Sequence, residues 1–297
     1  MTKSNTNPTS GILLLDKPSG VTSNQALGRA KRLLGIRKAG HTGTLDPMAT
    51  GLLTLCFGEA TKVSAFLLDA DKTYLAELRL GVETDSGDAD GAVVRERPVP
   101  GLDGDDVEAV LREFRGSIEQ VPPMVSALKH QGQRLHELAR RGIEVERPPR
   151  PVTIHELELL DCVPPRLELR VRCSKGTYVR SLAMDIGDRL GCGAHLTALR
   201  RTVSDPFDVD DAIDPDALEA LEPEARRARL LSPEQALVAL PLVEVDAEAA
   251  SDLGFGRRVR TGADPAETVR IRHGDRFLGV GRVDDAGVLH PKRLIRA

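Results

Sequence analysis

Hydrophobic and polar positions along the first two thirds of the chain follow patterns typical of both strands and helices. Residues 11–15 (GILLL) form an apolar run that ends at Pro18, which predicts a buried strand. Residues 23–34 repeat their hydrophobic side chains with helical spacing, and we expect Ser23 as the N-cap and Gly35 as the stop of this helix.

Two later segments alternate between hydrophobic and polar residues, as half-buried strands do. The inward-facing residues are expected to be Tyr74, Ala76, Leu78 and Leu80 in the first segment and Leu167, Leu169, Val171 and Cys173 in the second. A helix is expected to begin near Tyr178, with a buried face made of Val179, Leu182, Ala183, Ile186 and Leu190. This mixture predicts an α+β fold with a central, mostly antiparallel sheet flanked by helices.

The character of the chain changes after residue 204. Residues 205–238 are rich in acids and punctuated by prolines, which predicts a helical connector that packs on the preceding domain. From residue 239 onward, short alternating segments are broken by the turns HGD and DDAG, which predicts a small β-barrel-like module. We therefore expect a disordered tail (1–10), a large domain (11–204), the connector (205–238) and a C-terminal module (239–297).

The composition is that of a globular protein, with 297 residues of which 40% are hydrophobic and 29% charged. No apolar run approaches the ~18 residues that cross a bilayer, so we expect no membrane association. The four cysteines are scattered without a Cys-x-x-Cys pair, which favours a reducing compartment, the cytoplasm. The formal net charge of −4 hides basic segments before Leu68 and between Lys129 and Arg201, so a nucleic-acid partner stays open.

A single acid, Asp46, stands in the glycine-rich segment 40–53 (GHTGTLDPMATGLL). One interpretation is an N-cap, because Asp followed by Pro47 is typical of a helix start, with MATGLL as the first turn. The other is a reagent, because glycines let the backbone approach a ligand and substrate-handling groups often lie on such loops. A metal site is disfavoured, since His41 and Asp46 lack a clustered third ligand.

The segment KGTYVR around Tyr178 is unlike a core sequence. Thr177 is an expected helix cap, and Arg180 then lies in the first turn of the helix. A cation at that end opposes the helix dipole, so we expect Arg180 to face an anion, either Asp46 or a backbone phosphate. Taken singly, Tyr178 and the other tyrosine of the chain, Tyr74, also fit a buried core role.

Several segments together resemble the motifs of the bacterial tRNA pseudouridine-55 synthases, the TruB family. They are GILLLDKPSGVTSN, GHTGTLDPMATGLL, GEATK, DKTY, GVETDSGDADG, VPPMVSALKHQGQRLHELARRGIEV, CSKGTYVRSLAMDIG and GCGAHLTALRR. The resemblance covers Gly11 to about Arg201, and residues 239–297 more weakly resemble the family's PUA-like RNA-binding module. It implies a pseudouridine synthase fold, with 11–204 as the catalytic domain.

The resemblance also implies roles for residues that match the family's motifs. Asp46 is then the catalytic nucleophile, Tyr74 stacks on the target base and helps proton transfer, and Arg180 pairs with the aspartate. The substrate-binding residues implied are His41 beside flipped-out nucleotides, Tyr178 and Leu199 in the uridine pocket, Tyr74 again, and Lys17 and Lys62. No metal is implied.

The implied reaction is isomerisation of uridine-55 in the T-loop of tRNA to pseudouridine. It replaces an N-glycosidic bond with a carbon–carbon bond without redox change, so no cofactor is implied. Extruding the base costs a few kcal/mol, which stacking on Tyr74, worth ~1–3 kcal/mol, offsets. Asp46 as a nucleophile has two possible targets, C1′ of the sugar and C6 of the base, and both stay open.

The implied partner is the T-arm stem-loop of tRNA, bound by a monomer that needs no other protein and no guide RNA. Phosphate contacts are expected from Lys31–Lys38 and Lys129–Arg150, although both also fit solvated charged faces. Two alternatives are a non-catalytic RNA-binding protein with this fold and a guide-RNA-dependent relative. Asp46, Tyr74 and Arg180 together argue against the first, and HTGTLDPMATGLL with the short C-terminal module argues against the second.

Overall fold

The computed structural model describes residues 10–295 apart from residues 125, 127, 131, 136, 137, 139, 140 and 144. The expected disordered tail therefore lies, except for Ser10, outside the described residues. So does part of Lys129–Arg150, the second expected phosphate-binding region.

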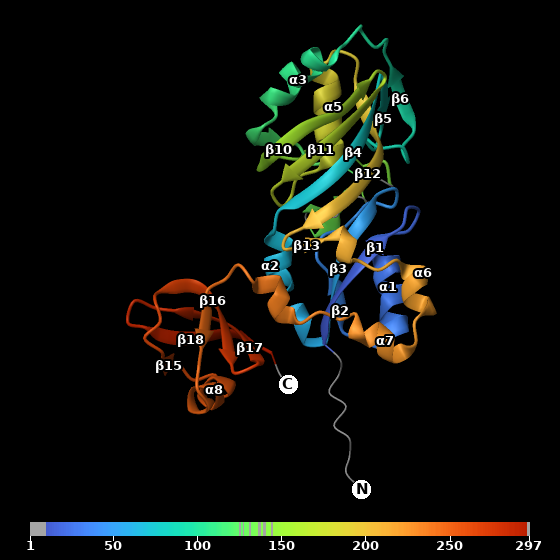
Figure 1. Ribbon diagram of the computed structural model, residues 1–297. Coiled ribbons are helices and arrows are strands. Elements are labelled where there is room, and N and C mark those ends of the chain that lie inside the picture. The colour runs from blue at the N-terminus through green and yellow to red at the C-terminus, as the bar shows by residue number, and fades with distance from the viewer. Residues whose placement is uncertain are drawn as a thin grey trace.

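A long twisted sheet forms the centre of the large domain (Figure 1). Its strands, in spatial order, are β1 (Gly11–Lys17), β3 (Thr50–Phe57), β12 (Ala194–Ser204), β4 (Lys72–Leu80), β11 (Arg166–Cys173), β10 (Arg150–Val163) and β7 (Gly116–Gln120). Two short strands extend it, β2 (Ala39–His41) beside β3 and β13 (Phe207–Asp208) beside β12. Among these described strands, β12 and β3 run parallel and the other pairs antiparallel, so the mostly antiparallel sheet is confirmed.

Hydrophobic clusters cover both faces of the sheet, and the side chains of β1 contribute to both. Leu13 and Leu15 join a hydrophobic cluster with side chains of α1 (Ser23–Leu34), α3 (Gly104–Glu113) and α5 (Val179–Arg189). Ile12 and Leu14 point to the other face, where a second cluster includes residues of η1 (Gly58–Lys62), α2 (Ser64–Asp69) and η3 (Pro233–Leu237). A strand that is buried on both sides needs a continuous apolar run rather than alternation, and GILLL supplies it.

The alternating strands and the two main helices form where the sequence predicts them. Tyr74 is half-buried, and the other expected inward-facing residues of β4 and β11 are buried. Gly35 ends α1 in the left-handed conformation, with φ of 70°. The expected N-cap Ser23 is wrong: Thr22 caps the helix in a capping box with Gln25, because its side chain reaches the backbone amide of Gln25.

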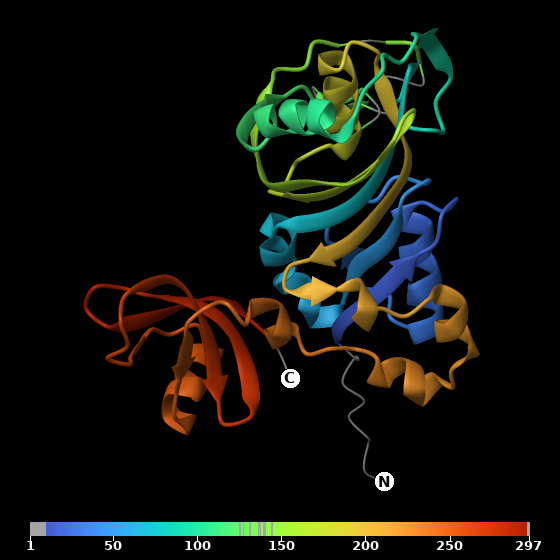
Figure 2. The ribbon, with the colours of Figure 1, turned by 45° about the horizontal axis from the view of Figure 1, so that its top comes forward.

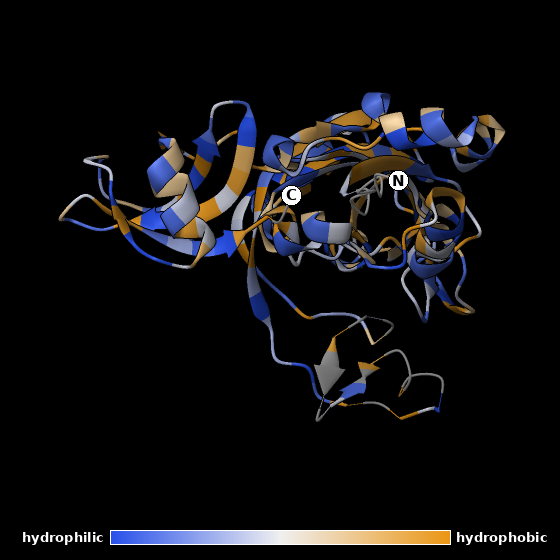
Figure 3. Cartoon of the chain, turned by 90° about the horizontal axis from the view of Figure 1, so that it is seen from below, coloured by the Kyte–Doolittle hydropathy of each residue, from blue (hydrophilic) through white to orange (hydrophobic). Residues whose placement is uncertain are grey.

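Smaller hairpins lie beside the sheet. They are β5 (Val82–Thr84) with β6 (Val93–Glu96), and β8 (Lys129–His130) with β9 (Gln133–Arg134). The second hairpin belongs to the segment between β7 and β10, whose described part extends from the body of the molecule (Figure 3).

The acidic connector runs back over the start of the large domain. It contains η2 (Val209–Asp211), α6 (Pro215–Ala220), α7 (Pro223–Ala228) and η3. Backbone bridges join Leu231 to Ile12 and Ile213 to Leu15. Arg29 of α1 binds the carboxylates of Asp216, at 2.6 Å, and Glu219. The domain boundaries stay a prediction.

The C-terminal module is a curled sheet flanked by one helix (Figures 1 and 2). Its elements are β14 (Leu242–Glu244), α8 (Ala247–Gly254), β15 (Val259–Arg260), β16 (Ala266–His273), β17 (Arg276–Val283) and β18 (Val288–Leu294). Val269, Ile271 and Leu289 form its own core, whereas Val280 belongs to the second cluster of the large domain. This half-barrel fits the expected PUA-like module.

No helix among the described residues is both long and apolar enough to span a membrane.

Candidate active site

Asp46 lies in an irregular loop between β2 and β3, so the helix cap expected at this position is wrong. The chain after Pro47 continues into β3 instead, because TGLLTLCF is apolar enough to be buried on both faces of the sheet. Local propensity favoured a helix start, and burial in the sheet overrides it. Asp46 is thus not used as a cap.

The backbone on both sides of Asp46 is fixed by contacts with other elements. The hydroxyl of Ser23 donates to the carbonyl of Leu45 at 2.9 Å and accepts from its amide at 2.8 Å. The carbonyl of Pro47 accepts from Nζ of Lys17 at 3.2 Å and from the amide of Gly20 at 2.8 Å. The loop therefore holds the carboxylate of Asp46 in place while leaving 33% of its side chain exposed.

Arg180 meets Asp46 as the sequence predicts. It stands in the first turn of α5, and its Nε lies 2.9 Å from Oδ2 of Asp46 while Nη2 donates to Oδ1 at 3.3 Å. The arginine is 2% exposed, so this two-point contact is largely shielded from water. The expected cap Thr177 is wrong, because Tyr178 occupies the N-cap position and the Thr177 hydroxyl donates to the carbonyl of Ser174.

A second carboxylate, which the sequence analysis missed, lies behind this pair. Oδ2 of Asp88 is 3.4 Å from Nη1 of Arg180, and the same nitrogen donates to the carbonyl of Ser86 at 2.9 Å. Asp88 is buried in the loop after β5, where it accepts from the hydroxyl of Ser86 at 2.6 Å. An acid within the glycine-rich motif GVETDSGDADG was the available signal.

The electrostatics of Asp46 combine opposing effects. Burial raises the pKa of its carboxyl above the ordinary 3.8, the charge of Arg180 opposes that rise, and the charges of Asp88 and Asp90 add to it. The arginine therefore offsets part of the effect of burial and favours the ionised form of the carboxylate.

The tyrosines and His41 belong to the same neighbourhood. Burial is the main cause that raises the pKa of Tyr74 and of Tyr178, and the charge of Asp46 contributes to both. Burial also lowers the pKa of His41, and its Nδ1 has no hydrogen-bond partner among the described residues. Leu199, on β12, is 8% exposed and packs in the same cluster as Tyr74. The two tyrosines therefore lie near the carboxylate of Asp46, His41 lies near Arg201, and Leu199 packs in the cluster beside Tyr74.

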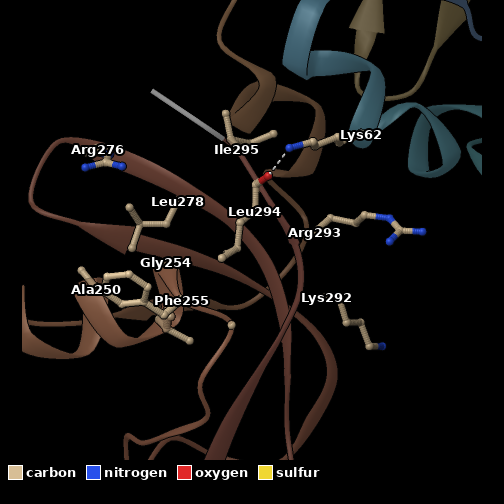
Figure 4. A pocket seen from close by; sticks show the side chains of 12 residues that line it. Lys62, Ala250, Gly254, Phe255, Arg276, Leu278, Lys292, Arg293, Leu294 and Ile295 are labelled. Atoms are coloured by element: carbon tan, nitrogen blue, oxygen red, sulfur yellow. Dashed lines mark hydrogen bonds between the residues drawn. The ribbon is translucent and has the colours of Figure 1, made fainter.

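The two lysines expected to bind substrate are engaged elsewhere. Nζ of Lys17 is fully enclosed and donates to the carbonyls of Pro18, Val21 and Pro47. Lys62 binds Glu59 and donates to the carbonyl of Leu294 at 2.6 Å, where the C-terminal module meets the large domain (Figure 4). Both lysines thus bind parts of the fold.

Within the part of the chain that the structure describes, no three His, Cys, Asp or Glu side chains gather as metal ligands would. The chemistry available at the site is that of an ionised carboxylate, a guanidinium and aromatic hydroxyls.

Sequence models of one family match nearly the whole chain. The model of the TruB family pseudouridylate synthase N-terminal domain matches residues 31–179. This chain belongs to the TruB family of pseudouridylate synthases. Models of the tRNA pseudouridylate synthase B C-terminal domain and of the TruB pseudouridine synthase II C-terminal domain match residues 180–238 and 241–295. The resemblance read from the motifs is thereby confirmed, and the chain is an enzyme of this family.

Individual relatives agree with the family. The tRNA pseudouridine synthase B of Chromohalobacter salexigens is 54% identical over 291 residues, which are 97% of this chain and 95% of the relative. That of Aromatoleum aromaticum is 58% identical over 286 residues, 96% and 92% of the two chains. A chain in the crystal structure of a Cbf5–Nop10–Gar1 complex matches with a TM-score of 0.75 at 27% identity, over 97% of this TruB-family chain and 85% of that chain.

Proposed function

We propose that this chain isomerises uridine-55 in the T-loop of tRNA to pseudouridine, with Asp46 as the nucleophile and without a guide RNA. The observation that carries the proposal is the contact of the partly exposed carboxylate of Asp46 with the buried guanidinium of Arg180. A protein that only bound RNA would have no use for an ionised carboxylate shielded in this way. The names of the relatives, tRNA pseudouridine synthase B, support tRNA as the substrate.

The first step is extrusion of the target base from its stack, which costs a few kcal/mol. The ring of Tyr74 offers a stacking surface worth ~1–3 kcal/mol for the extruded base. Tyr178 and Leu199 supply the rest of an apolar pocket, and His41 lies beside it to contact the neighbouring nucleotides. The binding energy of the base in this pocket offsets the free-energy cost of its extrusion.

The chemical step is nucleophilic catalysis by Asp46. Its carboxylate bonds to the nucleotide while the bond between N1 of uracil and C1′ of ribose breaks. The uracil turns and its C5 forms the new bond to C1′, while the bond between Asp46 and the nucleotide breaks and its electron pair returns to the carboxylate. C5 then loses its proton and N1, which kept the electron pair of the broken glycosidic bond, gains one. Arg180 favours the ionised form of the carboxylate before attack, and Tyr74 helps the proton leave C5.

A basic groove gives the RNA a second place to bind. It lies between α8, β17 and β18, with Lys62 of the large domain at its edge (Figure 4). Its described lining residues include the cations Arg276, Lys292 and Arg293 and no acid, while Lys62 at the edge is paired with Glu59. Phe255, also in the lining, is 78% exposed. Exposed aromatic rings among cations are typical of surfaces that bind unpaired nucleotides.

We also propose that the protein is a cytoplasmic monomer that acts on tRNA without another protein or a guide RNA. The matched Cbf5 chain was solved in complex with other proteins, so independence from partners needs its own test. The purified chain should form pseudouridine in an isolated T-arm stem-loop with no other protein or RNA present. Failure on the stem-loop would favour the guide-dependent alternative.

The test of the nucleophile is Asp46→Asn, assayed by mapping pseudouridine in unmodified tRNA. We expect no product and retained RNA binding. Asp69→Asn is the matched control, because Asp69 is an exposed carboxylate that pairs with Lys175 on the surface. Product from the Asp46 variant at the normal rate would refute the assignment and leave an RNA-binding protein as the better description.

A further inference from the structure

Arg201 is the bulkiest fully buried side chain of the described residues. It stands on β12 directly opposite Tyr74 of β4, so the two side chains share one face of the sheet. No carboxylate of a described residue lies within ion-pair distance of its guanidinium, and burying such a charge is costly. Because burying this guanidinium is costly, we expect Arg201 to have a function that compensates for the cost.

The donors of Arg201 are directed at the parts of the site. Nε donates to the carbonyl of Leu52 on β3 at 2.7 Å, and Nη2 donates to the carbonyl of Gly43 at 3.1 Å. Tyr74 lies opposite Arg201 on the neighbouring strand, and the charge of the guanidinium opposes the rise that burial causes in the pKa of this phenol. One rigid group thus contacts the sheet, the loop that leads to Asp46 and the tyrosine expected to carry the base.

The glycine at position 43 leaves room for the guanidinium beside that loop. Gly43 has φ of 108°, which L side chains rarely adopt, and a Cβ there would lie 3.3 Å from Nη1 of Arg201. Gly40, three residues earlier in the same motif, has no positive φ, and a Cβ there would meet open space. A side chain at position 43 would therefore meet strain and the guanidinium of Arg201, whereas one at position 40 would not. The sequence alone does not distinguish the two glycines.

We propose that Arg201 is a positioning residue that fixes the phenol of Tyr74 relative to the loop carrying Asp46. The inference rests on the proposed roles of Tyr74 and Asp46. If the extruded base lies on the Tyr74 ring, the orientation of that ring sets the distance from the nucleotide to the carboxylate. Arg201 sets this orientation because it lies opposite Tyr74 on the sheet and donates to the Gly43 carbonyl of the loop, without touching the nucleotide.

The main experiment compares Arg201→Met and Arg201→Lys by single-turnover rate and RNA affinity. We expect the methionine variant to lose rate by up to about 100-fold, as small displacements of reacting groups do, with unchanged affinity. Lysine keeps the charge and should recover part of the rate. Arg200→Lys is the matched control, because Arg200 is adjacent but pairs with Asp16 at the surface.

A Tyr74→Phe background separates positioning from a purely structural role. Without the phenol hydroxyl, Arg201→Met should cost much less rate than it does in the original chain. An equal loss in both backgrounds, a loss of RNA affinity alone or an unchanged rate would each overturn the proposal.

Two further measurements test the proposal even if the Arg201→Met variant does not fold. Gly43→Ala should lower the rate and Gly40→Ala should not; equal effects would contradict the proposal. The chain has no Trp and two tyrosines, so in Tyr178→Phe the near-ultraviolet spectrum reports Tyr74 alone. That spectrum should change on Arg201→Lys and not on Arg200→Lys. Because it needs no RNA, it can fail or succeed independently of the proposed function, which wild-type pseudouridine formation tests.

Discussion

Nη1 of Arg180 lies 3.4 Å from Oδ2 of Asp88, so the guanidinium that faces Asp46 is itself bound by a second buried carboxylate. Asp88 is in turn fixed by the Ser86 hydroxyl and by the amide of Asp90 at 3.1 Å. An arginine contacted by two acids has little freedom to rotate, and Asp46 is thereby presented at a defined angle. The contact also tunes charge, because Asp88 opposes the ionisation of Asp46.

Asp88→Asn is expected to have two separable effects. Removing its charge lowers the pKa of Asp46, so the acid limb of the pH–rate profile should move to lower pH. Loosening Arg180 should lower the plateau rate by about 10-fold or more, within the range for a displaced catalytic group. Single-turnover rates across pH measure both.

Asp90→Asn is the matched control for that variant. The exposed Asp90 also raises the pKa of Asp46, but no contact joins its carboxylate to Arg180 among the described residues. It should shift the acid limb without lowering the plateau. If Asp88→Asn behaves in the same way, the second carboxylate does not position Arg180.

The unmodified chain should lose activity as pH falls through a midpoint above 3.8, the ordinary value for Asp. The direction follows from the sign of the shift: burial raises the pKa of Asp46, and the reaction needs the ionised form. The same shift means that the folded state binds the proton more tightly than the unfolded one, so ionisation of Asp46 costs stability. Asp46→Asn should consequently unfold at a temperature no lower than the original chain at neutral pH, by thermal melting. A large drop would contradict this sign.

Lys17→Met should destabilise the fold and slow the reaction without weakening RNA binding. The carbonyls of Pro18 and Val21 lose the donor that Lys17 supplies, whereas Pro47 keeps the Gly20 amide, and a buried unsatisfied polar group costs about 1–3 kcal/mol. Burial also lowers the pKa of Lys17 to about 8, which shows that the buried charge is itself unfavourable. Removing that charge therefore offsets part of the loss of folding stability. Denaturant unfolding and an RNA titration measure the two effects. Lys175→Met, at an exposed lysine, is the control; a loss of RNA affinity confined to Lys17→Met would restore the expected substrate contact.

Phe255→Ala should weaken binding of full-length tRNA and leave binding of the isolated T-arm stem-loop unchanged. Loss of one base–aromatic stack, worth ~1–3 kcal/mol, corresponds to roughly 5- to 150-fold in affinity. Val163→Ala removes another solvent-exposed hydrophobic side chain, 57% exposed, from the end of β10 and should affect neither RNA. Equal weakening of both RNAs would show that the ring does not contact a distant part of tRNA. Competition titrations at fixed salt give the comparison.

Elements with a strong local pattern could be predicted from the sequence. The helical spacing of Ala26, Ala30 and Leu34 fixed the buried face of α1, and alternation placed Leu167 and Leu169 inward on β11. Arg180 could be predicted to face an anion because a cation in a first helical turn is unfavourable by itself. Each of these inferences needs only residues close together in the chain.

The predictions that were wrong or incomplete concern groups whose partners are distant in sequence. Ser23 looked like a cap and instead binds Leu45, 22 residues away. Lys17 looked free to bind RNA and instead binds three carbonyls, one of them at Pro47, 30 residues away.

The sequence by itself determined the family, the periodic elements and the residue types that the chemistry needs, because these follow from motif identity and local spacing. Only the tertiary structure decided which of two adjacent arginines enters the core, that the residues after Asp46 join a sheet, and that Asp88 stands behind Arg180. Burial is the physical reason. Whether a charged or polar group is solvated, paired or enclosed depends on strands and loops that meet only after folding. The residue type in the sequence is the same in all three environments and does not distinguish them.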